Sequence, residues 1–445
     1  MNPLPDSSTQ IVFQPRGIPP AGRLIPLGLQ HVVAAVVGII TPSIIVASTC
    51  NLSPEESTLL IQVSLLLTGV ATLLQLFPIF HRIGSGLPVI MGTSFAYLPT
   101  LKAIGAQFNF GTILGAEIVG GLVAILFGIF VRQIRPLFPP VVTGTVIFTI
   151  GLSLYPTAVT YMAGGSSSDS FGSIRNWVVA LITFAVVITL QHFTKGVLNL
   201  GAILFGMIVG YLIALPLGLV DFSNVLNYGW ISVPQPLCFE IIFEPSACVS
   251  LAIVYVVNAV QTIGDLSSTT AGGMNRLPTD RELSGGIIGQ GVMSVVGALF
   301  GGLPNASYSQ NVGIVTVNRV INRAVFAFAS LILLAAGFIP KFGAILTTIP
   351  QPVIGGATIS VFSTIAMTGI RMITSQPFTT RTSTVVGLSV ALGVGICQVG
   401  TTCFQGFPSW VGTVFASTPV VVSAIMAILL NLLLPKDKGA TEASQ

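Results

Sequence analysis

The chain has 445 residues, of which 52% are hydrophobic and only 7% are charged, and its mean hydropathy is +0.92. A soluble domain carries about 25% charged residues, so this composition excludes that class and indicates an integral membrane protein. The net charge of +4 comes from dispersed basic residues, which gives no reason to expect a nucleic-acid partner. The five cysteines lack paired spacing and the three histidines lie far apart, so no disulfide framework, metal site or cofactor is expected.

Hydrophobic stretches long enough to cross a bilayer, at about 20 residues per crossing, follow one another along most of the chain. Residues 1–24 and 436–445 are polar and are expected to be cytosolic tails. Between them the sequence predicts fourteen spans in two sets of seven, separated by a loop at 221–245. The first set, within 25–220, has spans near 25–47, 57–80, 86–104, 110–131, 137–156, 177–194 and 197–220. The second set, within 246–435, has spans near 246–264, 284–301, 303–321, 323–345, 349–370, 383–399 and 415–435.

The positions of lysine and arginine support this count and orientation. With the N-terminus inside, fourteen of the seventeen basic residues fall in inner segments, and Lys102, Arg175 and Lys341 fall outside. Short inner loops carry the excess of basic residues in membrane proteins, and a miscounted span would have scrambled the pattern. We therefore expect a multi-pass protein of the cytoplasmic (inner) membrane with both termini in the cytosol.

Two short matches relate the two sets of spans. Residues 86–88 (GLP) recur at 302–304, an offset of 216 residues, and residues 140–144 (PVVTG) resemble 352–356 (PVIGG), an offset of 212 residues. Because each set contains an odd number of spans, the two sets would lie in opposite orientations in the membrane. Inverted repeats of this kind place a binding site between their broken helices near the midplane.

The tenth span, 303–321, is too polar for a helix that faces lipid. Non-helical backbone is tolerated at membrane depth only where protein buries it or where it lines a cavity, and polar groups there mark a substrate pathway. Pro304 can end one helix and Gly313 can start another, which predicts about eight extended residues between them. A similar segment, Gly92–Tyr97, interrupts the third span, and the two segments could pair and satisfy each other's backbone groups.

Few ionisable residues lie within the predicted spans. Four polar residues at spacings of three, four and three share one face of the eighth span: Asn258, Gln261, Asp265 and Ser268. Asp265 could carry a coupling proton or could accept hydrogen bonds from backbone N–H groups. For Glu117 in the fourth span and His31 in the first, a structural role is the better interpretation, His31 being a hydrogen-bonding strut between helices.

The run Gln310-Asn311-Val312-Gly313, followed by Asn318-Arg319, resembles the signature of the nucleobase–ascorbate transporter family, also called the nucleobase:cation symporter-2 family. Gln30-His31, Gly92–Tyr97 and Gly264-Asp265 match it too, in order and in the expected spans. The resemblance implies an all-α protein of fourteen spans in a 7+7 inverted repeat. Spans 1–4 and 8–11 would form a core, spans 5–7 and 12–14 a gate. It also implies homodimers and uptake of xanthine, urate or uracil, usually with protons.

The resemblance also implies roles for single residues. Gln310 would hold the base through its amide, the backbone at Tyr97 and Ser309 would donate to ring oxygens, Tyr308 would pack nearby, and Asn311 would brace the site. The expected substrate-binding residues are therefore Gln310, Gln261, Tyr97, Ser309, Tyr308, Ala96 and Asn311. Glutamine rather than glutamate at 310 resembles the xanthine and uric acid branch. An amide can donate and accept, which suits the alternating N–H and C=O edge of an oxopurine.

Three positions depart from the family pattern. Gln261 stands where the family has a glutamate that binds substrate and couples protons, Gln290 stands where purine members have an acid, and Asn318 replaces a threonine. An amide cannot release a proton, so coupling would have to use Asp265 or Glu117, or would be absent. The expected residues for coupling or support are therefore Asp265, His31, Gln290, Glu117 and Asn318.

These observations predict a secondary transporter for xanthine or uric acid, coupled to protons or another cation. Three alternatives keep the fold: an uncoupled nucleobase facilitator, a uracil transporter and an anion transporter. An intramembrane enzyme would need a metal-ligand or nucleophile–base cluster, which histidines at 31, 81 and 192 do not supply. A receptor without transport activity is a further alternative, and flux assays separate it from a transporter.

Overall fold

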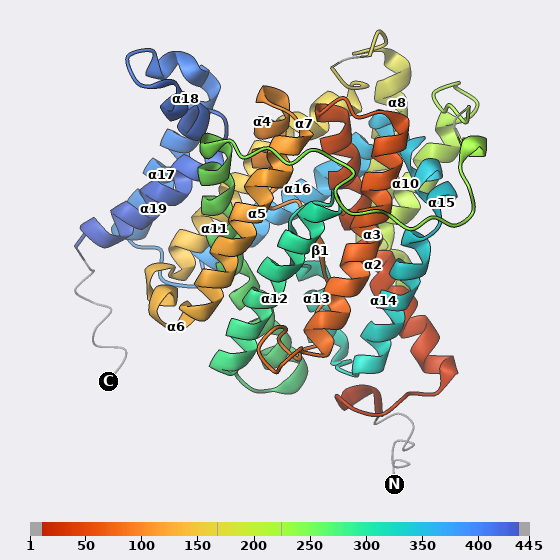
Figure 1. The fold of residues 1–445 in the computed structure, drawn as a ribbon, viewed down its shortest axis with the longest axis horizontal. Helices are drawn as coiled ribbons and strands as arrows, with labels where there is room; N and C mark the ends of the chain where they lie inside the picture. Colours follow the sequence, from red (N-terminus) through yellow and green to blue (C-terminus); the bar gives the residue numbers. More distant parts are fainter. Residues whose placement is uncertain (1–10, 167, 224, 436–445) are drawn as a thin grey trace.

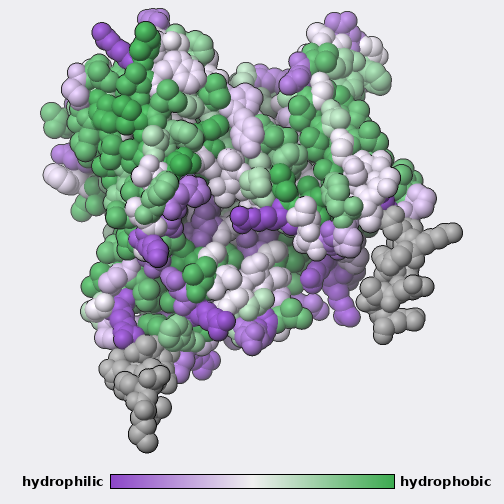
Figure 2. Space-filling view, turned by 180° about the vertical axis from the view of Figure 1, so that it is seen from behind, coloured by the Kyte–Doolittle hydropathy of each residue, from purple (hydrophilic) through white to green (hydrophobic). Residues whose placement is uncertain are grey.

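The computed structural model describes residues 11–166, 168–223 and 225–435, which form a bundle of α-helices with one short two-stranded sheet (Figure 1). Within these ranges, nine helices are long and apolar enough to cross a membrane, or eleven if each of two bent helix pairs counts as one span. The protein is therefore a mostly helical multi-pass membrane protein, as its composition predicts. Hydrophobic side chains predominate in the upper part of the face seen in Figure 2, and hydrophilic ones gather in the lower part.

The elements follow one another in two stretches of chain on either side of the loop near residue 225. The first stretch contains η1 (Ile11–Phe13), α2 (Ala21–Thr49), α3 (Pro54–Leu76), β1 (Met91–Thr93), α4 (Leu98–Gln107), α5 (Phe110–Ile129), α6 (Val131–Ile134), η2 (Arg135–Leu137), α7 (Pro140–Met162), α8 (Ile174–Phe193), α9 (Val197–Leu200) and α10 (Ala202–Ala214). The second contains η3 (Val225–Asn227), α11 (Pro245–Ser268), the π-helical turn η4 (Thr269–Gly273), α12 (Asp280–Leu299), β2 (Asn305–Ser307), α13 (Ser309–Asn318), α14 (Arg323–Gly337), α15 (Pro340–Thr347), α16 (Gln351–Ile373), α17 (Thr380–Val399), η5 (Gly400–Phe404), α18 (Ser409–Ala416) and α19 (Pro419–Leu433).

The helices pack in two groups. In the first helix group, α5 packs against α11 and α12, and α14 packs against α2 and α3, with the two strands and helices α4 and α13 among them. In the second helix group, α7 and α8 pack against α16, α10 packs against α8, and α17 packs against α19. Each group thus combines helices from both stretches of the chain. Residues that are far apart in sequence are therefore close together in the structure.

The two strands confirm the extended segments predicted in the third and tenth spans. β1 and β2 are antiparallel and buried throughout, with Gly92 opposite Ala306. Their mutual hydrogen bonds satisfy backbone groups that could not reach water at membrane depth. The backbone N–H of Tyr308 extends the pairing by donating to the carbonyl oxygen of Ile90 at 3.0 Å.

The extended run in the tenth span is shorter than predicted. Helix α13 already begins at Ser309, so Gly313 lies inside this helix and does not start it. The first N–H groups of a helix have no partner within the helix, so polar residues are well tolerated in the first turn. The polar residues 309–311 therefore form a first helical turn, and the prediction of extended backbone there is wrong.

Two further bends lie in the second half of the chain. Helices α14 and α15, which lie in the predicted span 323–345, meet at 81°, and α18, most of which precedes the predicted last span 415–435, meets α19 at 83°. In each pair a proline, Pro340 or Pro419, is the first residue of the second helix. Proline lacks a backbone N–H and fits the first helical position, so it restarts a helix in a new direction.

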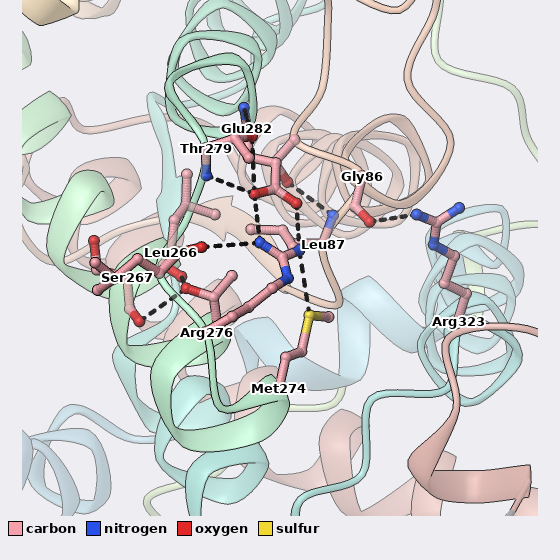
Figure 3. A network of polar contacts seen from close by, with 12 residues as sticks. Gly86, Leu87, Leu266, Ser267, Met274, Arg276, Thr279, Glu282 and Arg323 are labelled. Atoms are coloured by element: carbon pink, nitrogen blue, oxygen red, sulfur yellow. Dashed lines mark hydrogen bonds and ion pairs between the residues drawn. The ribbon is translucent and has the colours of Figure 1, made fainter.

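The connection from η4 to α12 is fixed by a polar network at one end of the bundle (Figure 3). The guanidinium of Arg276 lies 2.5 Å from a carboxylate oxygen of Glu282. Glu282 and Thr279 also form a reciprocal capping box that satisfies backbone N–H groups at the start of α12. Nearby, Arg323 donates to the carbonyl oxygen of Gly86 at 2.7 Å, which ties the start of α14 to the segment that leads into β1.

Gly92 allows strand β1 to approach helix α3 closely. A Cβ atom placed at Gly92 would lie 2.1 Å from Oγ1 of Thr68, which itself donates to the carbonyl oxygen of Ser64 at 2.7 Å. We expect Gly92→Ala to lower the melting temperature, because overpacking of this kind costs about 1–3 kcal/mol. Thermal unfolding in detergent measures the effect. The control is Gly387→Ala, where an added Cβ meets no atom within 4 Å; equal melting temperatures for the two variants would contradict the close packing.

Candidate functional site

A cavity of about 210 Å³ lies between the two helix groups, next to the paired strands. The first helix group contributes polar side chains to its wall, namely Ser94, Gln261, Ser307, Ser309 and Gln310. The second helix group contributes Ile147 and Ile150 from α7 and Thr364, Ile365, Thr368 and Arg371 from α16. The cavity thus has a wall from each group, so a relative movement of the groups would change access to it.

Gln310 is the second residue of α13 and is exposed toward this cavity. Its side-chain amide makes no hydrogen bond to any other residue in the described ranges, so both its N–H₂ and its oxygen are available to a ligand. The start of α13 also places backbone N–H groups and the positive end of the helix dipole at the cavity. This end of α13 is therefore suited to a ligand with both acceptor and donor groups.

Two aromatic residues add a flat apolar surface. Phe95 and Tyr308 both line the cavity. Phe95 packs edge-on against Phe362 of α16, with ring centroids 5.3 Å apart. The Tyr308 hydroxyl donates to the carbonyl oxygen of Thr93, so the ring is held against strand β1. Fixed aromatic rings beside a polar amide suit a planar heterocycle, which can stack and form hydrogen bonds at the same time.

Asp265 lies behind the cavity wall and binds two of its serines. Its carboxylate oxygens accept from the hydroxyl of Ser307 at 2.5 Å and from the hydroxyl of Ser309 at 2.8 Å. The side chain of Gln261 also reaches Ser309, at 3.4 Å. Of the two roles left open for Asp265, the structure shows an acceptor, but for side-chain hydroxyls and not for backbone N–H groups. The fourth residue of the predicted polar face, Ser268, is exposed and lies outside this cluster.

A second polar cluster lies deeper in the first helix group. The amide nitrogen of Gln290 donates to the Tyr97 hydroxyl at 2.9 Å and to the Asn258 side-chain oxygen at 2.7 Å. Thr262 donates to the amide oxygen of Gln290 at 2.7 Å. The Tyr97 hydroxyl also lies 3.2 Å from the carbonyl oxygen of Asn305 in β2. Both N–H groups and the amide oxygen of Gln290, which replaces the acid of the family pattern, are therefore engaged by protein groups.

The structure separates the predicted substrate-binding residues into two sets. Five of them line the cavity: Gln310, Gln261, Ser309, Tyr308 and Ala96. Tyr97 and Asn311 do not line it and are buried behind it. The amide nitrogen of Asn311 lies 3.1 Å from Nδ1 of His31 and 3.0 Å from the His31 carbonyl oxygen, and the His31 ring packs against Phe326. Asn311 and His31 thus connect α13 to α2, as expected of a brace and a strut.

Two of the predicted coupling or support residues lie away from the cavity. Glu117 is fully buried in α5, and Asn318 is the exposed last residue of α13, at the end opposite Gln310. Within the ranges that the structure describes, no group of three or more histidine, cysteine, aspartate or glutamate residues could hold a metal ion.

The polar face of α16 was missed in the sequence. Thr364, Thr368 and Arg371 all line the cavity, and Arg371 is the one charged residue among the described lining residues. Their spacings of four and three place them on one helical face, the same signal that singled out Asn258 and Gln261. In the sequence, Arg371 stands out only as one of the basic residues of the inner segments.

A helical membrane protein with a small polar cavity beside two broken spans belongs to the class of secondary transporters. Its fold is similar to that of the transmembrane domain of a cyanobacterium bicarbonate transporter, BicA, with a TM-score of 0.60 and 14% identity over 92% of this chain and 98% of that chain. The murine Slc26a9 anion transporter in the inward-facing state gives a TM-score of 0.61 and 10% identity over 92% and 68%. At such identities the likeness concerns the fold alone.

Sequence comparison defines the family. A model described as a permease family matches residues 22–402. The chain is 36% identical to the uric acid permease PucK of Bacillus subtilis, over 92% of this chain and 95% of the relative. It is 33% identical to the xanthine permease of the same organism, over 92% and 93%. It is 29% identical to the xanthine permease XanQ of Escherichia coli, over 98% and 96%. The chain therefore belongs to the nucleobase–ascorbate transporter family, and is a permease and not an enzyme.

Proposed function

We propose that this protein takes up an oxopurine nucleobase, xanthine or uric acid, across the cytoplasmic membrane, coupled to a cation. The amide of Gln310, which lines the cavity and has no hydrogen-bond partner among the described residues, carries this proposal. The relatives named xanthine permease and uric acid permease, at 33% and 36% identity over nearly the whole chain, support the substrate class.

The dimensions and chemistry of the cavity support a single fused-ring substrate. Its volume of about 210 Å³ is below the range of roughly 300–1,000 Å³ that is usual for drug-sized ligands. An oxopurine edge alternates C=O and N–H groups, and the Gln310 amide can donate to one and accept from the other. Ser309 and Gln261 flank this amide, and the rings of Phe95 and Tyr308 would contact the faces of the base.

We further propose fourteen spans in a 7+7 inverted repeat, within residues 25–220 and 246–435. The eleven long spans, the shorter apolar helix α10 and the two interrupted segments β1–α4 and β2–α13 together support this number. The first helix group would be the core and the second the gate, moving against each other in an elevator or rocking motion. The distribution of basic residues supports cytosolic tails at 1–24 and 436–445. We propose a homodimer, as is usual in this family.

Uptake into proteoliposomes tests the proposal. Radiolabelled xanthine, urate and uracil are compared, with and without a pH gradient and with bicarbonate and sulfate as competitors. We expect xanthine or urate to compete better than uracil, and the inorganic anions not to compete. A tenfold preference for uracil would overturn the substrate assignment, and inhibition by bicarbonate alone would favour an anion transporter on this fold.

Arg371 gives a prediction about anionic substrates. Urate is an anion at neutral pH, and Arg371 is the charged group on the gate side of the cavity. We expect Arg371→Gln to weaken urate binding about threefold to tenfold, since an exposed guanidinium is partly screened by solvent and salt. Binding of an uncharged purine should change less. Competition assays at two salt concentrations measure this, with Arg132→Gln on the exposed face of α6 as the control. Equal losses for charged and uncharged purines would contradict an electrostatic role.

A further inference from the structure

Glu117 is a buried acid that does not line the substrate cavity. It lies near the middle of α5, its side chain is fully buried, and neither carboxylate oxygen has a hydrogen-bond partner in the described part of the chain. A buried ionised carboxylate without donors is very costly, and at membrane depth the cost is higher still. Glu117 therefore requires a cation, either a proton or a metal ion.

Two neighbouring polar groups lie close to Glu117. The side-chain oxygen of Asn305 in β2 is buried and forms no hydrogen bond within the described ranges, and the hydroxyl of Tyr255 in α11 is buried beside Ser294. A Cβ atom placed at Gly297 of α12 would lie 3.5 Å from Oε1 of Glu117 and 3.8 Å from Nδ2 of Asn305, so both side chains reach the same gap. The ring of Tyr255 packs on Gly120, one helical turn from Glu117 on the same face of α5.

A proton satisfies these three groups better than a metal ion does. The groups around this gap comprise three acceptor oxygens without a partner in the described ranges, two on Glu117 and one on Asn305, and the hydroxyl of Tyr255. A protonated Glu117 can donate to Asn305 while its other oxygen accepts from Tyr255. A metal ion would need a larger set of oxygen ligands, and the described part of the chain has no cluster of three acids, histidines or cysteines.

Among the described residues, the elements packed against α5 bring few other titratable groups near Glu117. Tyr97 at the start of α4 and Tyr255 of α11 interact electrostatically with it. The charged residues of α12, which also packs against α5, are Asp280, Arg281 and Glu282 in its first turn, about four turns from Gly297. Lys102 of α4 is engaged with Thr157 of α7 at 2.6 Å. A proton on Glu117 would therefore not have to compete with a nearby basic side chain.

Strand β2 connects Glu117 to the cavity. Asn305 is the first residue of this strand, and Ser307, its last, lines the cavity and donates to Asp265. The backbone N–H of Asn305 donates to the Ser294 hydroxyl at 3.1 Å, and its carbonyl oxygen accepts from Tyr97. A hydrogen bond from protonated Glu117 to the Asn305 side chain would hold the first residue of this strand in place. It would thereby also hold Ser307 and Ser309 in position at the cavity.

We propose that Glu117, with Tyr255 and Asn305, is a proton-binding site of this transporter, and that a proton held there strengthens substrate binding. The inference rests on the proposed nucleobase function. The site takes over the role of the two acids of the family pattern that Gln261 and Gln290 replace. It acts through strand β2 and makes no contact with the substrate. By linkage, substrate binding raises the affinity of Glu117 for this proton by the same factor, so a proton is drawn from solvent at a pH high enough to ionise the acid in the free protein.

The number of protons taken up on binding tests the proposal. Xanthine binding to purified protein is measured by calorimetry in two buffers of different ionisation enthalpy. Ionisation of xanthine itself contributes equally to all variants and cancels in the comparison. At a pH at which Glu117 is ionised in the free wild type, we expect wild type to take up more protons than Glu117→Gln, whose amide mimics the protonated acid. We expect xanthine affinity in this variant to depend on pH only through the ionisation of xanthine.

A second variant keeps the test decisive if Glu117→Gln does not fold. Tyr255→Phe removes the donor to the ionised carboxylate, so the midpoint of the pH dependence of xanthine affinity should move to higher pH. Equal proton uptake by wild type and Glu117→Gln, with loss in Asp265→Asn, would overturn the proposal in favour of Asp265. If the xanthine affinity of wild type depended on sodium and this dependence were lost in Glu117→Gln, the site would bind a metal ion and the proposal would be overturned. Absence of any nucleobase binding by wild type would refute the proposed function itself.

Discussion

Gln310→Ala is expected to raise the dissociation constant for xanthine about tenfold to a hundredfold, which corresponds to roughly 1–3 kcal/mol for lost hydrogen bonds of a desolvated amide. The protein should stay folded, because the Gln310 side chain makes no hydrogen bond to another described residue and is exposed to the cavity. Calorimetric titration measures affinity and thermal unfolding measures stability. The matched control is Gln133→Ala, a glutamine exposed on α6, which should leave both unchanged.

Two conservative variants separate the parts of this prediction. Gln310→Asn keeps the amide but places it one methylene group closer to the backbone. If this variant lost about as much xanthine affinity as Gln310→Ala, the position of the amide would decide binding. Gln310→Glu keeps acceptor oxygens and removes both donors, so it tests whether the base is held by donation from the amide. A wild-type dissociation constant for Gln310→Ala would show that the base binds elsewhere.

Much of the fold could be predicted from the sequence. Hydrophobic length and the placement of basic residues identify most spans, because the bilayer imposes its thickness and its charge asymmetry on the chain. Pro304 and the polar run after it, with Gly92 in the third span, identify the paired strands. The start of α13 at Ser309 was missed, since a polar first helical turn and an extended segment look alike in sequence. The bends before Pro340 and Pro419 were missed because the hydrophobic pattern continues through them.

The site could be predicted only in part. The residues that follow the strands, such as Tyr308 and Gln310, are placed at the cavity by the chain itself, and their position needs no knowledge of other helices. The contacts of Tyr97 with Gln290, and the presence of Arg371 in the cavity wall, depend on how α11, α12 and α16 are rotated about their axes. Periodicity gives the face of a helix but not its neighbour, so these contacts required the structure.

Asp265→Ala is expected to lower both affinity and stability. The carboxylate accepts from Ser307 and Ser309, and hydrogen bonds to a charged group contribute about 1.5–3 kcal/mol each. Without it the two hydroxyls lose their acceptor, and the wall of the cavity next to Gln310 loses its anchor on α11. We expect xanthine affinity to fall at least about tenfold and the melting temperature to drop.

The serine variants distinguish this anchoring role from direct binding by Asp265. Ser307→Ala removes one of the two hydrogen bonds and Ser309→Ala removes the other, so each should reproduce part of the loss. Either serine variant combined with Asp265→Ala should be less destabilised than the sum of the single effects, because residues that share a hydrogen bond are coupled. Asp221→Ala, an exposed acid in the loop after α10, serves as the control. Strictly additive losses in calorimetry and thermal unfolding would show that Asp265 acts without the serines, and the anchoring role would be wrong.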